Sequence, residues 1–290
     1  MAKLTSPVEL SWKNILVVTD LSAHSVSALT CVVPIATRSD SVIHLLPVSR
    51  PEIEIALSGA YGDMKLLIQT DAQQQLGTLE TAIATGPHKI WRREGNVWRS
   101  IKDLVQSEHI DLIVVGINGE SDFMGSGAEE VMRKAVCSVL TVGPHVSSSA
   151  DKPSLAQVLY VMNLWKESHD GLEYAIQLAI RYKSRLLLLH VVEQEESRQS
   201  DHEWLKAFRR IMRNLLPESA ANLAEGPVLR VEVAKNISAR ILQVADELSA
   251  DLVVMEVGPE GAGATLLPHK LYEIISRASC PVLTVRSAQE

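Results

Sequence analysis

Short apolar runs recur along the chain, separated by longer segments in which apolar and polar residues alternate at helical spacing. The run at 112–115 (LIVV) is apolar at consecutive positions, and similar runs stand at 14–19 (NILVVT) and 139–142 (VLTV). Consecutive apolar residues are typical of strands buried on both faces of a parallel sheet, whereas a period near 3.6 predicts amphipathic helices. The pattern therefore predicts alternating strands and helices, an α/β fold.

The first half of the chain reads as strand and helix in strict alternation. This order implies right-handed crossovers and a parallel sheet. The predicted strands are 14–19, 41–48, 88–93, 111–115 and 139–142, and the predicted helices are 22–36, 61–84, 97–108 and a helix that begins near 126.

The second half repeats this alternation of strands and helices. A tract rich in Pro, Ser and Asp at 143–154 separates the two halves and predicts a linker. The segment CSVLTV at 137–142 returns as CPVLTV at 280–285, and the offset Cys280 minus Cys137 equals that of Asn163 minus Asp20, namely 143. The chain is therefore predicted to be a tandem duplication, with domains at 1–146 and 147–290. The predicted strands of the second copy are 158–162, 185–192, 228–234, 251–255 and 282–285.

Composition narrows the class of partner. The net charge of -7 is spread over both halves, with 12 basic and 16 acidic residues in 1–150 and 16 basic and 19 acidic in the rest. Neither half has the excess of Lys and Arg over Asp and Glu that is typical of proteins that bind nucleic acid. No apolar signal core or membrane-spanning run occurs in the sequence, so we expect no membrane association and a cytoplasmic protein. The three cysteines, without CxxC, and the scattered histidines predict no metal site.

Glycines follow the strand at 111–115. Gly116 and Gly119 come first, and the segment Gly125-Ser126-Gly127 opens the next predicted helix. Bare backbone at the carboxyl end of a parallel strand, leading into a helix amino terminus, is a typical phosphate site. The alternative is a tight turn in which Ser126 and Glu129 form a capping box that satisfies the same amides. The residues leave both interpretations open.

Several motifs together resemble the universal stress protein family: an acidic residue ending the first strand, DLIVVGxxG, Gly-Ser, AEEVMRKA and C-x-VLTV. The resemblance covers nearly the whole chain, more loosely in the second half. It implies two tandem Rossmann-like domains (adenine nucleotide alpha hydrolase-like), each a five-stranded parallel sheet flanked by helices. It also implies a pseudo-dimer in which Val139 to Val142 of one domain pair with Val282 to Val285 of the other.

One branch of the family binds adenine nucleotide through GxxG, nine residues, and then Gly-Ser or Gly-Thr. Here only five residues separate Gly119 from Gly125, so the loop is four residues shorter. The resemblance implies ATP, with Mg²⁺, as the ligand of the first domain. The predicted cofactor-binding residues are Thr19, Asp20, Gly95, Asn96, Gly116, Asn118, Gly119, Gly125, Ser126 and Gly127.

Asp20 is expected to accept a hydrogen bond from an adenine or ribose edge. Its alternative role is that of a helix cap, and the same alternative applies to Asn96. In the second half, alignment on DLVVM places Glu256 and Pro259 at the two glycines, whereas a two-residue slip places Gly258 and Gly261 there instead. By either alignment Pro268-His269 replaces Gly-Ser, and Asn163 replaces the acidic residue. A proline removes a backbone donor and any side chain crowds a phosphate, so the second site is predicted to be lost.

No nucleophile with a paired base and no converging carboxylates stand near the loop. The leading hypothesis is therefore a non-catalytic stress-response module that binds adenine nucleotide, with a homodimer left open. One alternative is a scaffold protein that binds no nucleotide, and a disfavoured one is an enzyme of the wider adenine nucleotide hydrolase group. His44 and His190 are expected at equivalent points of buried strands, in packing roles.

Overall fold

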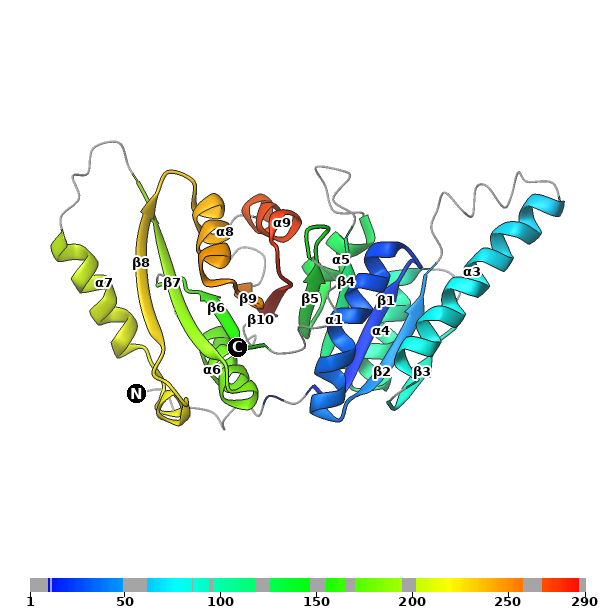
Figure 1. The fold of residues 1–290 in the computed structure, drawn as a ribbon, viewed down its shortest axis with the longest axis horizontal. Helices are drawn as coiled ribbons and strands as arrows, with labels where there is room; N and C mark the ends of the chain where they lie inside the picture. The colour runs from blue at the N-terminus through cyan, green and yellow to red at the C-terminus, as the bar shows by residue number, and fades with distance from the viewer. Residues whose placement is uncertain are drawn as a thin grey trace. The chain divides into compact units, whose positions relative to one another are not determined.

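The computed structural model describes residues 10, 12–48, 62–84, 86–93, 96–117, 126–146, 155–164, 170–194, 202–257 and 268–286. These residues form two compact units, one from Trp12 to Val146 and the other from Leu155 to Arg286 together with Leu10. Each unit is a parallel sheet flanked by helices (Figure 1). The predicted α/β fold class is confirmed.

The first unit alternates strands and helices as the hydrophobic pattern predicts. Its elements are β1 (Asn14–Thr19), α1 (Ala23–Ser39), β2 (Val42–Pro47), α3 (Gly62–Ile83), β3 (His88–Ile90), α4 (Val97–Ser107), β4 (Leu112–Gly116), α5 (Ser126–Lys134) and β5 (Ser138–Val142).

The second unit repeats the alternation and adds one short 3-10 helix. Its elements are β6 (Gln157–Val161), α6 (Asp170–Tyr182), β7 (Arg185–Glu193), α7 (His202–Asn214), η1 (Glu218–Asn222), β8 (Val228–Ala234), α8 (Ile237–Leu248), β9 (Leu252–Val257), α9 (Pro268–Arg277) and β10 (Val282–Arg286).

The strands of the first unit lie in the order β3-β2-β1-β4-β5, and those of the second in the corresponding order β8-β7-β6-β9-β10. Neighbouring strands within each unit are parallel. Leu112, Ile113 and Val114 of β4 have no exposed surface. The central strands are thus covered on both faces, as their consecutive apolar residues predict.

One aspartate per unit joins the start of the first strand to the start of the fourth. The Oδ2 atom of Asp111 accepts hydrogen bonds from the backbone amides of Lys13 and Asn14, at 2.8 and 2.9 Å. Asp251 accepts from the amides of Ala156 and Gln157 at the same two distances. The same long-range contact in both halves confirms the predicted repeat.

Strand registers correct one expectation. Ile15 of β1 pairs with Ile43 of β2, and Val158 of β6 pairs with Leu186 of β7. Since Val158 is the counterpart of Ile15, the residue equivalent to His44 is Leu187, and His190 corresponds to Pro47. The prediction that His44 and His190 hold equivalent points is wrong, because a continuous apolar run does not fix register.

Gly77 lies in the interior of α3, where an added Cβ would meet no atom within 4 Å. Glycine in a helix interior costs about 0.5–1 kcal/mol relative to alanine through backbone entropy. We therefore expect Gly77→Ala to raise the free energy of unfolding by about 0.5–1 kcal/mol in urea denaturation. A lower midpoint in the variant would contradict the open environment of this position.

Candidate functional site

The first unit has a topological switch point between β1 and β4. From β1 the chain moves to β2 and then β3 on one side, and it returns to β4 on the other side of β1. Ligands of open α/β sheets bind at the carboxyl ends of strands where the order reverses in this way. The pairing of Val18 with Val115 sets the next residues, Thr19 and Gly116, beside each other at this edge.

The junction of β1 and α1 is held by a cap network. Thr19 is buried, and its Oγ1 accepts from the amide of Leu21 at 3.0 Å, a residue with positive φ (62°). Ser22 is the N-cap of α1 and accepts from the amide of Ser25. Asp20 Oδ1 accepts from the amide of Ser22 at 3.0 Å and from Ser25 Oγ at 2.5 Å. The N-cap is therefore Ser22, and Asp20 supports it from the turn before the helix, which fixes the Asp20 carboxylate at the switch point.

The other predicted site residues divide into two groups. Asn96 is the N-cap of α4, with Oδ1 accepting from the amide of Arg99 at 2.9 Å, and Gly116 ends β4. Ser126 and Gly127 begin α5, although their side-chain surroundings lie outside the described part of the chain. The remaining predicted site residues, which lie outside the described residues, are Gly95, Asn118, Gly119 and Gly125.

The switch point of the second unit holds a buried carboxylate. Val161 pairs with Met255, so Glu256 stands at the position that Gly116 holds in the first unit. Glu256 is only 3% exposed, and its Oε2 accepts a hydrogen bond from the hydroxyl of Tyr160 at 3.3 Å. Burial, and then the charge and hydrogen bond of Glu256, raise the pKa of Tyr160 well above its ordinary value. A buried acidic group here disfavours a polyanionic ligand.

Helix α6 approaches this carboxylate closely. A Cβ added at Gly171 would lie 2.7 Å from Glu256 Cβ and 2.9 Å from Glu256 Oε2. The offset of 143 makes Val17 and Ala28 the first-unit counterparts of Tyr160 and Gly171. Three contacting positions have thus changed together between the units. Sequence reasoning found Glu256 but missed Tyr160 and Gly171, which a comparison of the two halves could have identified.

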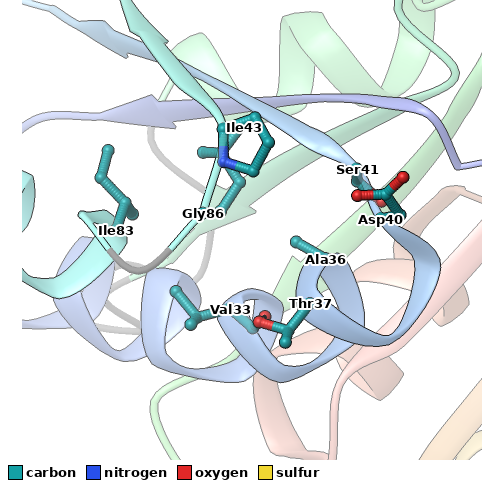
Figure 2. A pocket seen from close by; sticks show the side chains of 9 residues that line it. Val33, Ala36, Thr37, Asp40, Ser41, Ile43, Ile83 and Gly86 are labelled. Carbon is teal, nitrogen blue, oxygen red and sulfur yellow. Dashed lines mark hydrogen bonds between the residues drawn. The ribbon is translucent and has the colours of Figure 1, made fainter.

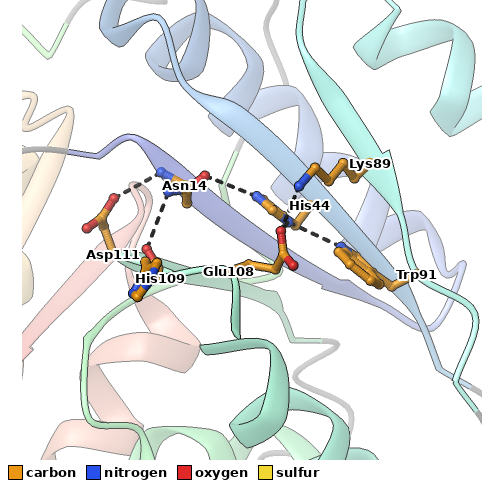
Figure 3. A network of polar contacts seen from close by, with 7 residues as sticks. All are labelled: Asn14, His44, Lys89, Trp91, Glu108, His109 and Asp111. Carbon is orange, nitrogen blue, oxygen red and sulfur yellow. Dashed lines mark hydrogen bonds and ion pairs between the residues drawn. The ribbon is translucent and has the colours of Figure 1, made fainter. Parts of the chain in front are cut away.

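A polar network surrounds His44 on β2 (Figure 3). His44 is 1% exposed, its Nδ1 accepts from Trp91 Nε1 at 3.2 Å, and its Nε2 lies 3.2 Å from Asn14 Oδ1. Because Nδ1 accepts, the neutral ring carries its proton on Nε2 and donates to Asn14. The Trp91 ring lies parallel to the imidazole, with centroids 6.2 Å apart. The imidazole is fully engaged in packing and hydrogen bonding.

Burial lowers the pKa of His44 from its ordinary value of 6.5. The charge of Glu108, whose Oε2 lies 3.9 Å from His44 Nδ1, opposes this shift, and Lys89 adds to it. Lys89 Nζ lies 2.7 Å from the same Glu108 oxygen. The folded protein therefore keeps His44 neutral where the unfolded chain begins to protonate it.

The free energy of unfolding is expected to fall as pH decreases below about 6.5, because His44 then binds a proton in the unfolded chain but stays neutral when it is buried in the folded protein. One such group contributes a slope of at most about 1.4 kcal/mol per pH unit. We expect His44→Leu, which installs the residue of the second unit, to have a shallower slope between pH 7.5 and 5.5 in urea denaturation. The slope that remains includes His190, whose pKa burial also lowers. An unchanged slope would contradict the assignment.

A cavity of about 130 Å³ lies near the amino ends of strands β2 and β3, at the end of the first sheet opposite to the switch point (Figure 2). It is smaller than typical ligand sites of about 300–1,000 Å³, and it opens near the amino end of β2, away from Thr19 and Gly116. Its lining residues are Val33, Ala36, Thr37, Asp40, Ser41, Ile43, Ile83, Gly86 and Pro87. This apolar hollow with an acidic side chain does not suit a nucleotide.

The surroundings of two cysteines disfavour the thiolate form. Burial raises the pKa of Cys31 to about 11 and that of Cys280 to about 12, with Asp251 and Asp246 adding to the second shift. Among the residues that the structure describes, no group of three or more His, Cys, Asp or Glu is arranged to hold a metal ion. Within the same ranges, no helix combines the length and apolar character of a membrane span.

Comparison with known proteins identifies the fold. The sequence model described as the universal stress protein family matches residues 11–143 and again 156–286. No curated protein sequence matches the chain. A universal stress protein from Archaeoglobus fulgidus DSM 4304 has a similar structure, with 18% identity, a TM-score of 0.67, and coverage of 96% of this chain and 100% of that chain.

Two solved structures of single-domain length match about half of the chain. One is a universal stress protein in complex with cAMP, with 20% identity, a TM-score of 0.35, and coverage of 47% of this chain and 99% of that chain. The other is the universal stress protein from Archaeoglobus fulgidus in complex with dAMP, with 16% identity, a TM-score of 0.32, and coverage of 45% and 97%.

Proposed function

The chain belongs to the universal stress protein family, and we propose that it is a non-catalytic stress-response module whose first unit binds one adenine nucleotide. The observation that carries this proposal is the contrast between the two switch points. Gly116 and Asp20 stand at the first, whereas the buried Glu256 and Asn163 occupy the corresponding positions of the second. A polyphosphate is compatible with bare backbone and is repelled by a buried carboxylate.

The proposed ligand is ATP or a related adenine nucleotide, with Mg²⁺ as its companion ion. The ligands cAMP and dAMP of two solved relatives belong to the same class. Asp20 would accept a hydrogen bond from the adenine or ribose, and the glycines from Gly116 onward would admit the phosphates. A micromolar ligand requires about 8 kcal/mol of binding free energy, while one exposed helix end supplies about 0.3–1 kcal/mol. Base, ribose and phosphate contacts must therefore act together.

Calorimetry with ATP tests the proposal on two variants of the first unit. Asp20→Asn retains an acceptor for the amide of Ser22 and installs the residue of the second unit, Asn163. Losing a charged acceptor costs about 1.5–3 kcal/mol, so we expect roughly 10- to 100-fold weaker binding. Gly125→Val places a side chain in the predicted phosphate loop and is expected to abolish the heat.

Asp40→Asn is the matched control. This substitution makes the same chemical change as Asp20→Asn, in the same unit. Asp40 is the C-cap of α1, and asparagine tolerates its left-handed backbone conformation (φ 51°). Its affinity for ATP should equal that of the intact chain. Equal, negligible heats for all four proteins would reject nucleotide binding. Steady phosphate release from ATP well above background would instead reject the non-catalytic assignment.

A nucleotide-free scaffold is the second candidate, and one observation favours it. Asp20 and Asn96 both accept hydrogen bonds from helix-start amides, so each has a structural role that explains its presence. In this case the glycine region is a turn, and calorimetry gives no heat with any of the proteins above.

We also propose that the two units pair through Val139–Val142 and Val282–Val285. Within its own unit, each of these strands ends the sheet order, and an apolar sheet edge facing water favours association. Hydrogen exchange should then protect the amides of β5 and β10 as strongly as those of central β1. Fast exchange along both strands, comparable with the other sheet ends β3 and β8, would contradict the pairing. A homodimer and a cytoplasmic location stay predictions.

A further inference from the structure

Helix α7 carries a stripe of basic residues on its exposed side. Lys206, Arg209, Arg210 and Arg213 are all exposed, and their i, i+3, i+4, i+7 spacing places them on one face of the helix. At a rise of 1.5 Å per residue the stripe is about 10 Å long. This is a local feature, since the chain as a whole has a net charge of -7.

The opposite side of α7 is apolar and packs against its own unit. Met212 has no exposed surface, and the Phe208 ring lies 5.3 Å from the ring of buried His190 on β7. Trp204 packs edge-on against Phe208 at 5.5 Å. The apolar face thus holds the helix on its own unit, beside β8 (Figure 1), and the basic stripe is what α7 presents outward.

The arginines of the stripe lack partners within the part of the chain that the structure describes. Among the described residues, Arg209, Arg210 and Arg213 make no hydrogen bond or ion pair, and Lys206 lies 3.7 Å from Glu203. The other described arginines of this unit all have partners: Arg181, Arg185, Arg230, Arg240, Arg277 and Arg286. The unpaired ones among the described arginines of this unit therefore gather on one helix face.

Most of the stripe does not stabilise the helix that carries it. Lys206 with Arg210, and Arg209 with Arg213, are like charges four residues apart, which destabilises a helix. The helix between the corresponding strands of the first unit, α3, instead contains Asp63, Asp71 and Glu80 against one lysine, Lys65. The basic face is therefore a property of the second copy, and within it only Arg213, in the last turn, carries a charge that suits the helix dipole.

We propose that the basic stripe of α7 is a docking surface for an acidic helical segment of a partner protein. Arginine pairs with carboxylates through two parallel hydrogen bonds, and a helix with Glu at i, i+3, i+4 and i+7 has the matching spacing. Half-exposed Ile211 lies between the stripe and the apolar face of α7, about 100° around the helix from Arg210, and offers an apolar contact beside the stripe. The acidic chain as a whole repels nucleic acid, and the apolar face that would enter a bilayer packs against its own unit.

Two double variants with equal change in charge test this surface. R209E/R213E reverses the stripe, and R185E/R277E reverses two exposed arginines elsewhere on the same unit. The probe is a fluorescein-labelled helical peptide with Glu at i, i+3, i+4 and i+7, and fluorescence anisotropy measures its affinity for the full chain. We expect binding by the intact chain, at least tenfold weaker binding by R209E/R213E, and a change within twofold for R185E/R277E.

Thermal denaturation separates docking from a structural role. R209E/R213E turns the i,i+3 neighbours 206–209 and 210–213 into opposite-charge pairs but places an acidic residue in the last turn of α7. These effects oppose each other, so its melting temperature should stay close to that of the intact chain, and unfolding of the variant at the assay temperature would overturn the proposal. Equal loss of peptide affinity in both double variants would show a general charge effect and would also overturn it. So would absence of peptide binding by the intact chain at low salt, or tighter binding to DNA or to vesicles with anionic lipid. None of these results depends on the nucleotide site.

Discussion

Replacing Gly171 with alanine is expected to destabilise the protein by about 1–3 kcal/mol, the usual cost of inserting a methyl group into filled space. The new Cβ would lie 2.7 Å from Glu256 Cβ, so α6 or β9 must shift. The sign is opposite to the stabilisation expected for Gly77→Ala, although both glycines are helical. Urea denaturation of the two variants measures this contrast directly.

The cause can be isolated by a double-mutant cycle with Glu256→Gly, which installs the residue of the first unit, Gly116. That change removes the Cβ, Cγ and Oε2 atoms that crowd position 171, although it leaves the buried hydroxyl of Tyr160 without this partner. We expect Gly171→Ala to cost less on this background, with an interaction free energy of about 1 kcal/mol or more. Strictly additive effects would show that Glu256 is not what requires glycine at 171.

Asp111→Ala is expected to destabilise the protein by about 2–4 kcal/mol. The change removes an oxygen that accepts from two backbone amides, those of Lys13 and Asn14, and a hydrogen bond to a charged group contributes about 1.5–3 kcal/mol. Burial is incomplete at this edge, so water replaces part of the loss. Chemical denaturation measures the effect.

Asp111→Asn is the matched control, because its amide oxygen can still accept from both amides without the charge. It should lose less than half as much stability as the alanine variant. Asp251→Ala should lose a similar amount to Asp111→Ala, since it breaks the same pair of contacts in the second unit. Equal, small effects of alanine and asparagine at 111 would show that these hydrogen bonds contribute little.

Much of the fold could be predicted because each buried parallel strand is a short run of consecutive apolar residues in the sequence. LIVV at 112–115 and NILVVT at 14–19 need no distant information to be identified as strands, and the recurring C-x-VLTV segment reveals the duplication. Register is different, since it depends on partners far along the chain. That is why His44 and His190 were expected at equivalent points and are not.

The candidate site was predictable only in part. The end of the first strand and the glycine after the fourth follow from local pattern, and the topology brings Thr19 and Gly116 together. The contact of Tyr160 with Glu256 spans 96 residues, and the need for glycine at 171 arises from packing of a helix on a sheet. Such contacts leave no local signal, and only comparison of the two copies position by position exposes them.

The number of nucleotides bound per chain tests the central claim most directly. Equilibrium dialysis of the full chain against labelled ATP with Mg²⁺ should saturate at one nucleotide per chain, because bare backbone remains at Gly116 whereas buried Glu256 occupies the second switch point. Saturation at two per chain would show that the carboxylate does not exclude the ligand. No binding would show that neither unit is a nucleotide site.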